Sequence, residues 1–209
     1  MRGIEKLYGF FLRNLREQKH KIAVLQLTGR IEDFLVKEFV YFAYEKSGRK
    51  IFALTNIGKR GQKKIDICLL RGKNLREVEV YGMIEAKYFR NRHRFKSSNA
   101  MDETSPTLNS LKKQLYPFKG NSQGGFKVNL LSLTDNIYGL ILASYVNEKK
   151  DNKVKKNFYQ AILSKAEERN FRSHDLQKPY FNPVFEDVKS KVLNTNFYVT
   201  LRAGLWKKK

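Results

Sequence analysis

Apolar residues at the start of the chain recur every three to four positions, which predicts an amphipathic helix over residues 4–19. The short apolar segment 21–29 fits neither a helical nor a strand period, so it receives no assignment. A second helical stripe occupies residues 32–48, where Gly48 is suited to end the helix. The residues expected on the buried side of this second helix are Phe34, Leu35, Phe39, Phe42 and Ala43.

The rest of the chain alternates strand and helix patterns separated by polar segments. Residues 63–87 read as two apolar strands joined by a polar turn, and residues 136–147 are apolar enough for a central strand buried on both faces. Other strands are expected over 49–58 and 196–206, and other helices over 107–118 and 157–171, with charged connections at 90–106 and 148–157. This order predicts an α/β domain, with a mixed central sheet flanked by helices on both sides.

Composition narrows the function classes. The 209 residues suit one domain with elaborations, and 42 Lys and Arg against 20 Asp and Glu give a net charge of +22. Such an excess indicates a polyanionic partner, with nucleic acid the first expectation and a membrane surface the second. No apolar run reaches the roughly 18 residues of a membrane span. A single cysteine excludes an internal disulfide and fits a reducing, cytoplasmic location.

Three charged residues interrupt the apolar strands of segment 63–87. Asp66 lies within "KIDICLL", and Glu85 and Lys87 lie within "GMIEAKYF". Opposed residues of a hairpin have positions that add to twice the turn centre, so a turn near residues 75 and 76 places Asp66 beside Glu85. Residues two apart share a face of a strand, which puts Lys87 on the same face as Glu85.

Two carboxylates on adjacent strands lie close enough to share one divalent cation. Mg²⁺ prefers oxygen ligands, and the backbone carbonyl of Ala86 offers another one. Lys87 then faces the metal-bound water, which suits phosphodiester hydrolysis. The alternative interpretation is an ordinary surface ion pair of Asp66 with Lys87 or Lys64, in a nucleic-acid-binding protein without catalytic activity.

The pieces "KKIDICLL" and "MIEAK", with the order helix, strand, hairpin, helix, strand around them, resemble the PD-(D/E)xK nuclease superfamily. That group includes restriction endonucleases, Holliday-junction resolvases and RecB-type nuclease domains. The resemblance covers about residues 30–145 and departs at Ile65, where many members have proline. It implies a restriction-endonuclease-like fold over residues 31–209, with residues 1–30 as an N-terminal helical extension.

The resemblance also implies a deoxyribonuclease dependent on Mg²⁺ or Mn²⁺. Asp66, Glu85 and the carbonyl of Ala86 would then bind the metal, and Lys87 would serve the nucleophilic water. Members of the superfamily often add an acid from the preceding helix. The candidates here are Glu32, Asp33 and Glu38, with Glu32 preferred and Glu38 second because of their angles to the apolar face. Gln114, on the helix after the second acidic strand, occupies the place of a glutamine found in some members.

The segment after the predicted site is basic. Arg90, Arg92, Arg94 and Lys96 alternate with aromatic residues, and with Lys64 they are expected to contact phosphates. No helix-turn-helix, zinc-finger or RNA-recognition signature is present, so we expect branched or duplex DNA to be bound by structure and backbone charge. An RNA nuclease with the same core is a further alternative. The resemblance implies a homodimer, and small basic nucleases are typical of viruses and mobile elements.

Overall fold

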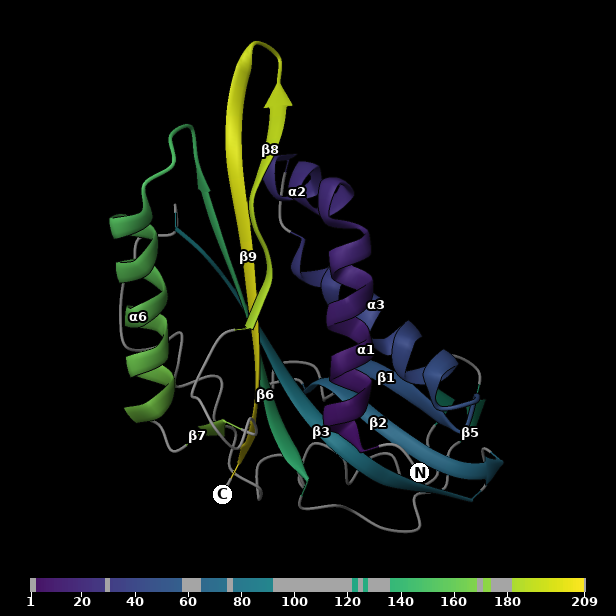
Figure 1. Cartoon of the computed structure of the whole chain (residues 1–209). Coiled ribbons are helices and arrows are strands. Elements are labelled where there is room, and N and C mark those ends of the chain that lie inside the picture. Colours follow the sequence, from purple (N-terminus) through teal and green to yellow (C-terminus); the bar gives the residue numbers. More distant parts are fainter. Residues whose placement is uncertain are drawn as a thin grey trace.

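Residues 4–46 form three helices that lie together on one face of a mixed sheet (Figure 1). The computed structural model describes residues 3–28, 31–57, 65–74, 77–91, 122–123, 126–127, 136–168, 171–173 and 182–208. The helices are α1 (Ile4–Glu17), α2 (Lys19–Thr28) and α3 (Glu32–Lys46), with α6 (Asn152–Glu168) on the opposite face. The predicted α/β architecture with helices on both sides of the sheet is therefore confirmed.

The apolar stripes of the first two predicted helices are buried as expected. All six apolar residues of the α1 stripe are buried, namely Ile4, Leu7, Tyr8, Phe11, Leu12 and Leu15. On α3, Leu35, Phe39 and Ala43 are buried as predicted, but Val36 is buried more fully than Phe34. Gly48 follows the helix end with φ 69°, the left-handed conformation that glycine adopts without strain. The buried residues of α1, α2 and α3 belong to one hydrophobic cluster, so among the described residues the first two helices share their core with α3.

The sheet has seven strands. Its order is β1 (Ile51–Ile57), β2 (Ile65–Asn74), β3 (Glu77–Arg90), β6 (Ile137–Asn147), β9 (Thr195–Lys208) and β7 (Phe171–Ser173), with β8 (Asn182–Val192) also paired to β9. Among the strands that the structure describes, β3 and β6 run parallel and the other pairs are antiparallel. A separate two-stranded sheet joins β4 (Ser122–Gln123) to β5 (Phe126–Lys127).

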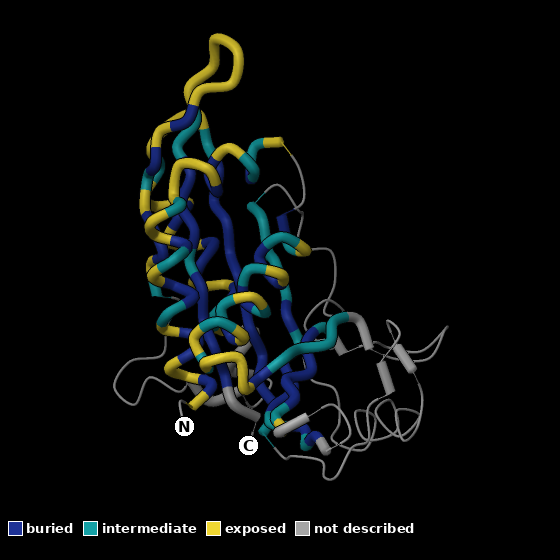
Figure 2. Tube along the Cα trace, turned by 90° about the vertical axis from the view of Figure 1, so that its right-hand side faces the viewer, coloured by how far each residue is buried: buried dark blue, intermediate teal, exposed yellow. Residues whose placement is uncertain are grey.

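The centre of the sheet is fully enclosed (Figure 2). Every residue of β6 except the last is buried, which confirms the prediction of a strand covered on both faces. Three apolar clusters account for this burial. The largest lies between the sheet and α1–α3, and two smaller ones lie on the other face, one of them under α6.

Several elements were not predicted as the structure has them, among them α2, β4, β5 and β7, and two of the longer ones have a visible reason. The helix α6 begins at Asn152, inside the segment expected to be a charged connection, because Asp151 caps it by accepting the Val154 N–H at 2.9 Å. The strand β8 received no prediction because register shifts on either side of Phe185 interrupt the alternation of buried and exposed residues. The predicted helix 107–118 lies outside the described residues.

Candidate active site on the β2–β3 hairpin

The register of the β2–β3 hairpin aligns the two acids. Ile67 pairs with Ile84 and Cys68 pairs with Met83, and the same register continued by one step sets Asp66 opposite Glu85. Two register shifts, between Leu69 and Leu70 and between Gly72 and Asn74, offset each other, so the pairs at both ends of the hairpin fit a turn centred between residues 75 and 76. Asp66 and Glu85 therefore lie on the same face of adjacent strands, and Lys87 follows on that face of β3.

The backbone between Glu85 and Lys87 is tied to Asp66. The pairing of β2 with β3 ends at Ile67 and Ile84, although β3 continues to Arg90. Beyond that point the Ala86 N–H donates to Oδ2 of Asp66 at 2.7 Å. Since the N–H and C=O of one strand residue point to the same edge, the Ala86 carbonyl is also directed toward β2. The two strands thus part at the candidate site, with the Asp66 side chain between them.

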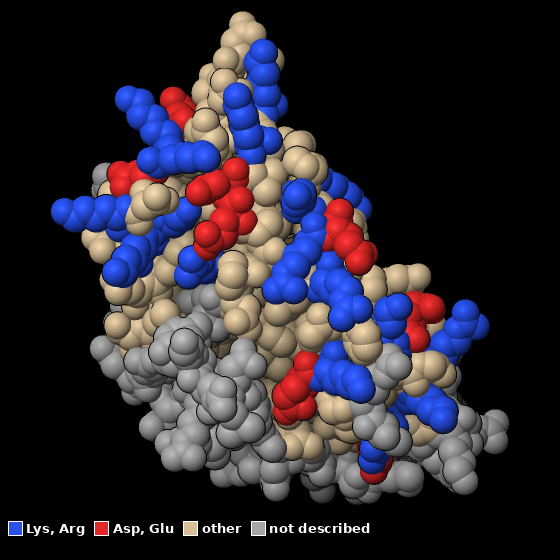
Figure 3. Space-filling view, in the orientation of Figure 1, with Lys and Arg blue, Asp and Glu red and all other residues tan. Residues whose placement is uncertain are grey.

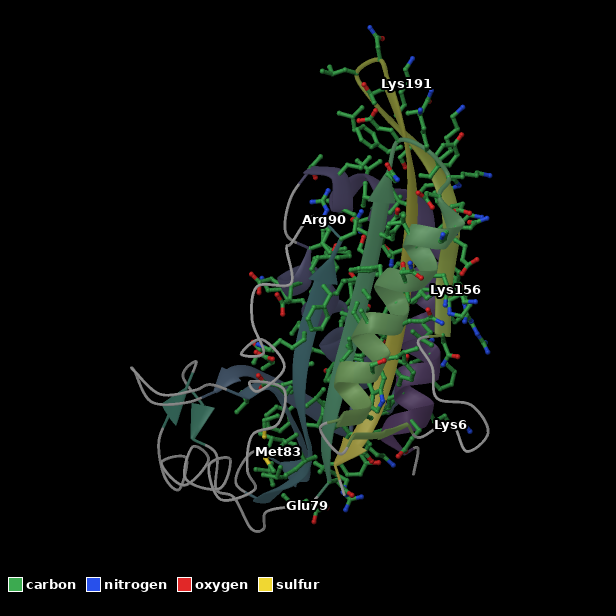
Figure 4. All side chains as sticks on the ribbon, turned by 90° about the vertical axis from the view of Figure 1, so that its left-hand side faces the viewer. Lys6, Glu79, Met83, Arg90, Lys156 and Lys191 are labelled. Atoms are coloured by element: carbon green, nitrogen blue, oxygen red, sulfur yellow. The ribbon has the colours of Figure 1, made fainter. Side chains whose placement is uncertain are left out.

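Glu85 and Lys87 form a polar interval between two apolar clusters. Met83 belongs to the cluster around Cys68, and Phe89 packs against the cluster under α6. Between them on the same face of β3, Nζ of Lys87 lies 3.8 Å from Oε1 of Glu85. Their side chains are only 23% and 11% exposed, so both charges are largely withdrawn from water. Figure 4 is turned to the α6 side of the sheet and labels Met83 and Arg90 on β3.

The electrostatic environment of Asp66 is that of a partly desolvated acid among charges. Burial raises the pKa of Asp66 above its ordinary value. The Ala86 N–H and the Lys87 ammonium both lower this pKa, and the carboxylate of Asp33 raises it. The net direction is upward, so Asp66 is harder to ionise than a free aspartate. A nearby divalent cation would oppose both effects that raise the pKa.

Of the three helix acids, Asp33 is the one whose charge acts on Asp66. Asp33 is exposed in the first turn of α3. Glu32 instead acts on Tyr88, on the helix-covered face of β3. Glu38 accepts a hydrogen bond from Nδ2 of Asn14 at 3.0 Å, so its carboxylate joins α3 to α1.

Glu32 was preferred because its side chain points close to the apolar face of the helix, and this choice assumed that the site lies between that helix and the sheet. By strand alternation, Asp66 and Glu85 instead lie on the other face of the sheet, so the angle of a side chain to the apolar face of α3 does not decide which acid acts on Asp66. Asp33 was a candidate in the sequence, and its proximity to Asp66 was not visible there.

The predicted phosphate-binding residues are only partly described. Arg90 ends β3 on the face opposite Lys87, and its Nε is buried without a hydrogen-bond partner. By strand alternation it shares that face with Tyr88, whose pKa it lowers, so it is oriented toward the helices. The other predicted residues lie outside the described part of the chain, namely Lys64, Arg92, Arg94, Lys96 and the candidate Gln114.

The donor set fits a hard cation that keeps part of its water. Within the described ranges, no three His, Cys, Asp or Glu side chains form a group able to hold a metal. The site offers two carboxylates, from Asp66 and Glu85, and the Ala86 carbonyl. Mg²⁺ is commonly bound by one or two carboxylates, with waters and substrate phosphate oxygens completing its octahedron. The carboxylate of Asp66 is partly desolvated and has other acids nearby, so a bound cation would neutralise negative charge that is costly there.

The comparisons with known proteins add no family to this description. No family model, no curated protein and no solved structure matches the chain. In the part of the chain that the structure describes, no helix combines the length and the apolar composition needed to cross a membrane.

Proposed function

We propose that the protein is a metal-dependent nuclease that hydrolyses phosphodiester bonds of DNA. The observation that carries the proposal is the placement of Asp66 beside the Glu85–Lys87 pair, through the Ala86 N–H and the charge of Lys87, where the pairing of β2 with β3 ends. Surface ion pairs are usually exposed, whereas these acids are mostly removed from water. Charged side chains that are largely buried, at a point where two paired strands separate, are typical of sites that bind a charged ligand.

The order of elements also supports the resemblance to the PD-(D/E)xK nucleases. The helix α3 precedes β1, the β2–β3 hairpin follows, and β6 then pairs parallel to β3. Parallel neighbours require a crossover, and residues 92–135 supply its length. A restriction-endonuclease-like arrangement is therefore part of this proposal.

Each side chain of the candidate site has a proposed task. Asp66, Glu85 and the Ala86 carbonyl would hold Mg²⁺ or Mn²⁺, and Asp33 would add negative charge behind Asp66. When bound, such a cation polarises a phosphate oxygen and lowers the pKa of its water. Lys87 would orient the attacking water and stabilise the negative charge that grows on the phosphate. The Ala86 N–H keeps Asp66 in place throughout.

The charge of the chain favours nucleic acid as the substrate. A net charge of +22 supplies the phosphate-neutralising surface that sequence-independent binding needs. Lys and Arg side chains cover much of the face in Figure 3, with acidic residues interspersed. We therefore propose binding through the phosphate backbone of branched or duplex DNA.

The test is cleavage of labelled linear, branched and single-stranded DNA, and of RNA, in Mg²⁺, Mn²⁺ or EDTA. Glu85→Gln should abolish metal-dependent cutting while DNA binding persists. Glu79→Gln is the matched control, because Glu79 lies on the same strand but pairs with Arg71 away from the site. Tight binding with no cutting under any metal would make the protein a binding module, and cutting of RNA alone would change the substrate class.

A homodimer is the proposed assembly, since cutting both strands of a duplex takes two sites. The apolar stripe of α1 is used inside the chain and is therefore not available as the dimer contact. Sedimentation at micromolar protein, with and without DNA, tests this proposal. A monomer in both conditions would contradict it.

A further inference from the structure

The β8–β9 hairpin extends beyond the body of the protein as an arm (Figure 1). We call the arm residues 188–199, from the Val188–Val199 pair to the turn. The last pair is Val192 with Thr195, so the turn consists of Leu193 and Asn194 alone. Figure 2 shows the loop at its end exposed on all sides, while the strands below it are buried.

The tip of the arm carries an unusual residue. Leu193 is 91% exposed and has φ 52°, in the left-handed region that two-residue turns normally fill with glycine or asparagine. A leucine there is unfavourable both for the backbone and for the exposed apolar side chain. Val192 beside it is 36% exposed, which extends the apolar tip. Strain and exposure together at one position indicate a function that the isolated fold does not need.

One side of the arm is basic. Lys189 and Lys191 are exposed on the same face of β8, and no acidic residue follows Asp187 in the chain. At the base of the arm, Nζ of Lys150 lies 5.2 Å from the ring centre of Tyr198. Lys191 projects near the end of the hairpin in Figure 4, and basic side chains lie just below the tip of the molecule in Figure 3. An apolar tip with two cations along one of its strands complements stacked bases with phosphates beside them.

From this arrangement we infer that the arm is a DNA wedge: Leu193 inserts between stacked base pairs while Lys189 and Lys191 contact the flanking phosphates. Apolar side chains at such points unstack a base step and kink the duplex, which lets more protein surface reach the phosphates. A two-stranded ribbon is narrow enough to enter a groove. The choice of DNA as partner rests on the proposed function.

The sheet register sets the spacing between the wedge and the candidate active site. Lys87 is level with Ile141 on β6, which pairs with Gly204 on β9. The tip lies ten residues before Gly204, at Asn194, immediately ahead of the start of β9. At the rise of a strand this is roughly 33 Å, the length of about ten base pairs. The wedge would therefore act about one helical turn from the scissile phosphate.

The experiment uses duplexes with 2-aminopurine at single positions across about fifteen base pairs on each side of the cleavage site. Fluorescence is read in EDTA, so no strand is cut. The wild type should increase the fluorescence at a step about one turn from the scissile bond. Leu193→Asn, which suits the left-handed turn but lacks the apolar side chain, should abolish the increase and weaken binding roughly tenfold. Leu193→Met, which keeps an apolar side chain, should retain the signal.

The phosphate contacts of the arm lysines are tested by the salt dependence of DNA affinity. Lys191→Ala should reduce the slope of log affinity against log salt by about 0.9. Lys37→Ala, which removes an exposed lysine of α3 away from the arm, is the control and should leave the unstacking signal intact. An unchanged fluorescence signal in Leu193→Asn would overturn the wedge.

Three further outcomes are informative. Binding without unstacking by the wild type would overturn the wedge and leave the nuclease proposal standing. Unstacking without any metal-dependent cutting would support the wedge and contradict the nuclease. Loss of a dimer in Leu193→Asn, with DNA binding unchanged, would show that the tip contacts a second copy of the chain.

Discussion

Oδ2 of Asp66 accepts a hydrogen bond from the backbone N–H of Ala86 at 2.7 Å, where pairing of β2 with β3 has ended. This bond explains how an acid is tolerated within an apolar strand. The Asp66 carboxylate accepts the Ala86 N–H in place of the β2 carbonyl that would accept it if the pairing continued. The bond also fixes the carboxylate beside Glu85 and Lys87. The Ala86–Asp66 hydrogen bond thus has two roles: it satisfies a backbone N–H, and it favours the charged form of the Asp66 carboxylate.

The first prediction separates these two roles. Asp66→Asn keeps an oxygen that can accept the Ala86 N–H and removes a charge that is costly to bury. We expect the free energy of unfolding at pH 7 to be unchanged or higher in this variant. Asp66→Ala leaves the N–H without its acceptor and should lose about 1 kcal/mol. Urea unfolding of the two variants measures the difference, and equal losses in both would contradict the assigned bond.

A second prediction concerns pH. The pKa of Asp66 is raised in the folded state, mainly by burial, so the native protein binds this proton more tightly than the unfolded chain does. The stabilising contribution is complete below the ordinary aspartate pKa and is lost as the pH rises through the raised value. The free energy of unfolding of the wild type minus that of Asp66→Asn should therefore fall with pH across this window. Urea titrations of both proteins between about pH 3 and 7 give this difference, and a rising difference would show that the pKa is lowered instead.

Metal binding provides a third test, which does not require cleavage. Mg²⁺ or Mn²⁺ bound only by the folded protein stabilises it by about 1.4 kcal/mol at ten times the dissociation constant. For a chain of this length the melting temperature should rise by about 3–5 °C. Glu85→Gln removes one of the two carboxylates and should lose most of the rise. Glu79→Gln should keep it, and the same rise in both variants would place the metal elsewhere.

The role of Lys87 leads to a fourth prediction. Lys87→Met keeps a long side chain without the ammonium, so cleavage should fall roughly 10²–10⁴-fold while DNA affinity stays within about twofold. Because Lys87 lowers the pKa of Asp66, its removal should raise that pKa further. Any residual activity should then require a higher pH than the wild type does. A parallel loss of affinity and rate would show that Lys87 only binds phosphate.

Cys68 offers a check that these variants remain folded. It lies two residues after Asp66 in a fully apolar cluster, and burial raises the pKa of its thiol to about 12. We expect a thiol reagent to react with Cys68 only on unfolding, at a rate that matches global opening in urea. A variant whose thiol reacts at once in native buffer has lost the hairpin core, and its activity then carries no information about the site.

The hairpin is the part of the fold that was most fully predictable from the chain. Its alternation and its turn position are local properties, because a strand places every second residue on one face. The register of Asp66 with Glu85 agrees with the turn position because the two register shifts of the hairpin offset each other. The buried centre of the sheet was also visible, since a run such as residues 137–146 has no polar face to expose. The same holds for the stripe of α1.

Elements defined by their tertiary contacts were harder to predict. The helix α2 has only weak periodicity, and it buries Gln26, whose Oε1 accepts a hydrogen bond from Oγ of Ser144. At the start of α6, the charged residue Lys155 is buried because Nζ donates to both oxygens of Asp187, at 2.9 and 3.0 Å. These polar residues are tolerated inside only because their partners come from distant segments.

The candidate site also combines features set by local spacing with features set by contacts between distant segments. The sequence by itself determined that Asp66, Glu85 and Lys87 share one face of a hairpin, because period and register act between near neighbours. Only the tertiary structure decided that Asp33 is the helix acid that acts on Asp66, that Glu38 is bonded to Asn14, and that Arg90 is turned toward the helices. Those outcomes depend on how α3 lies across the sheet, which follows from the packing of apolar surfaces far apart in the chain and not from any local spacing.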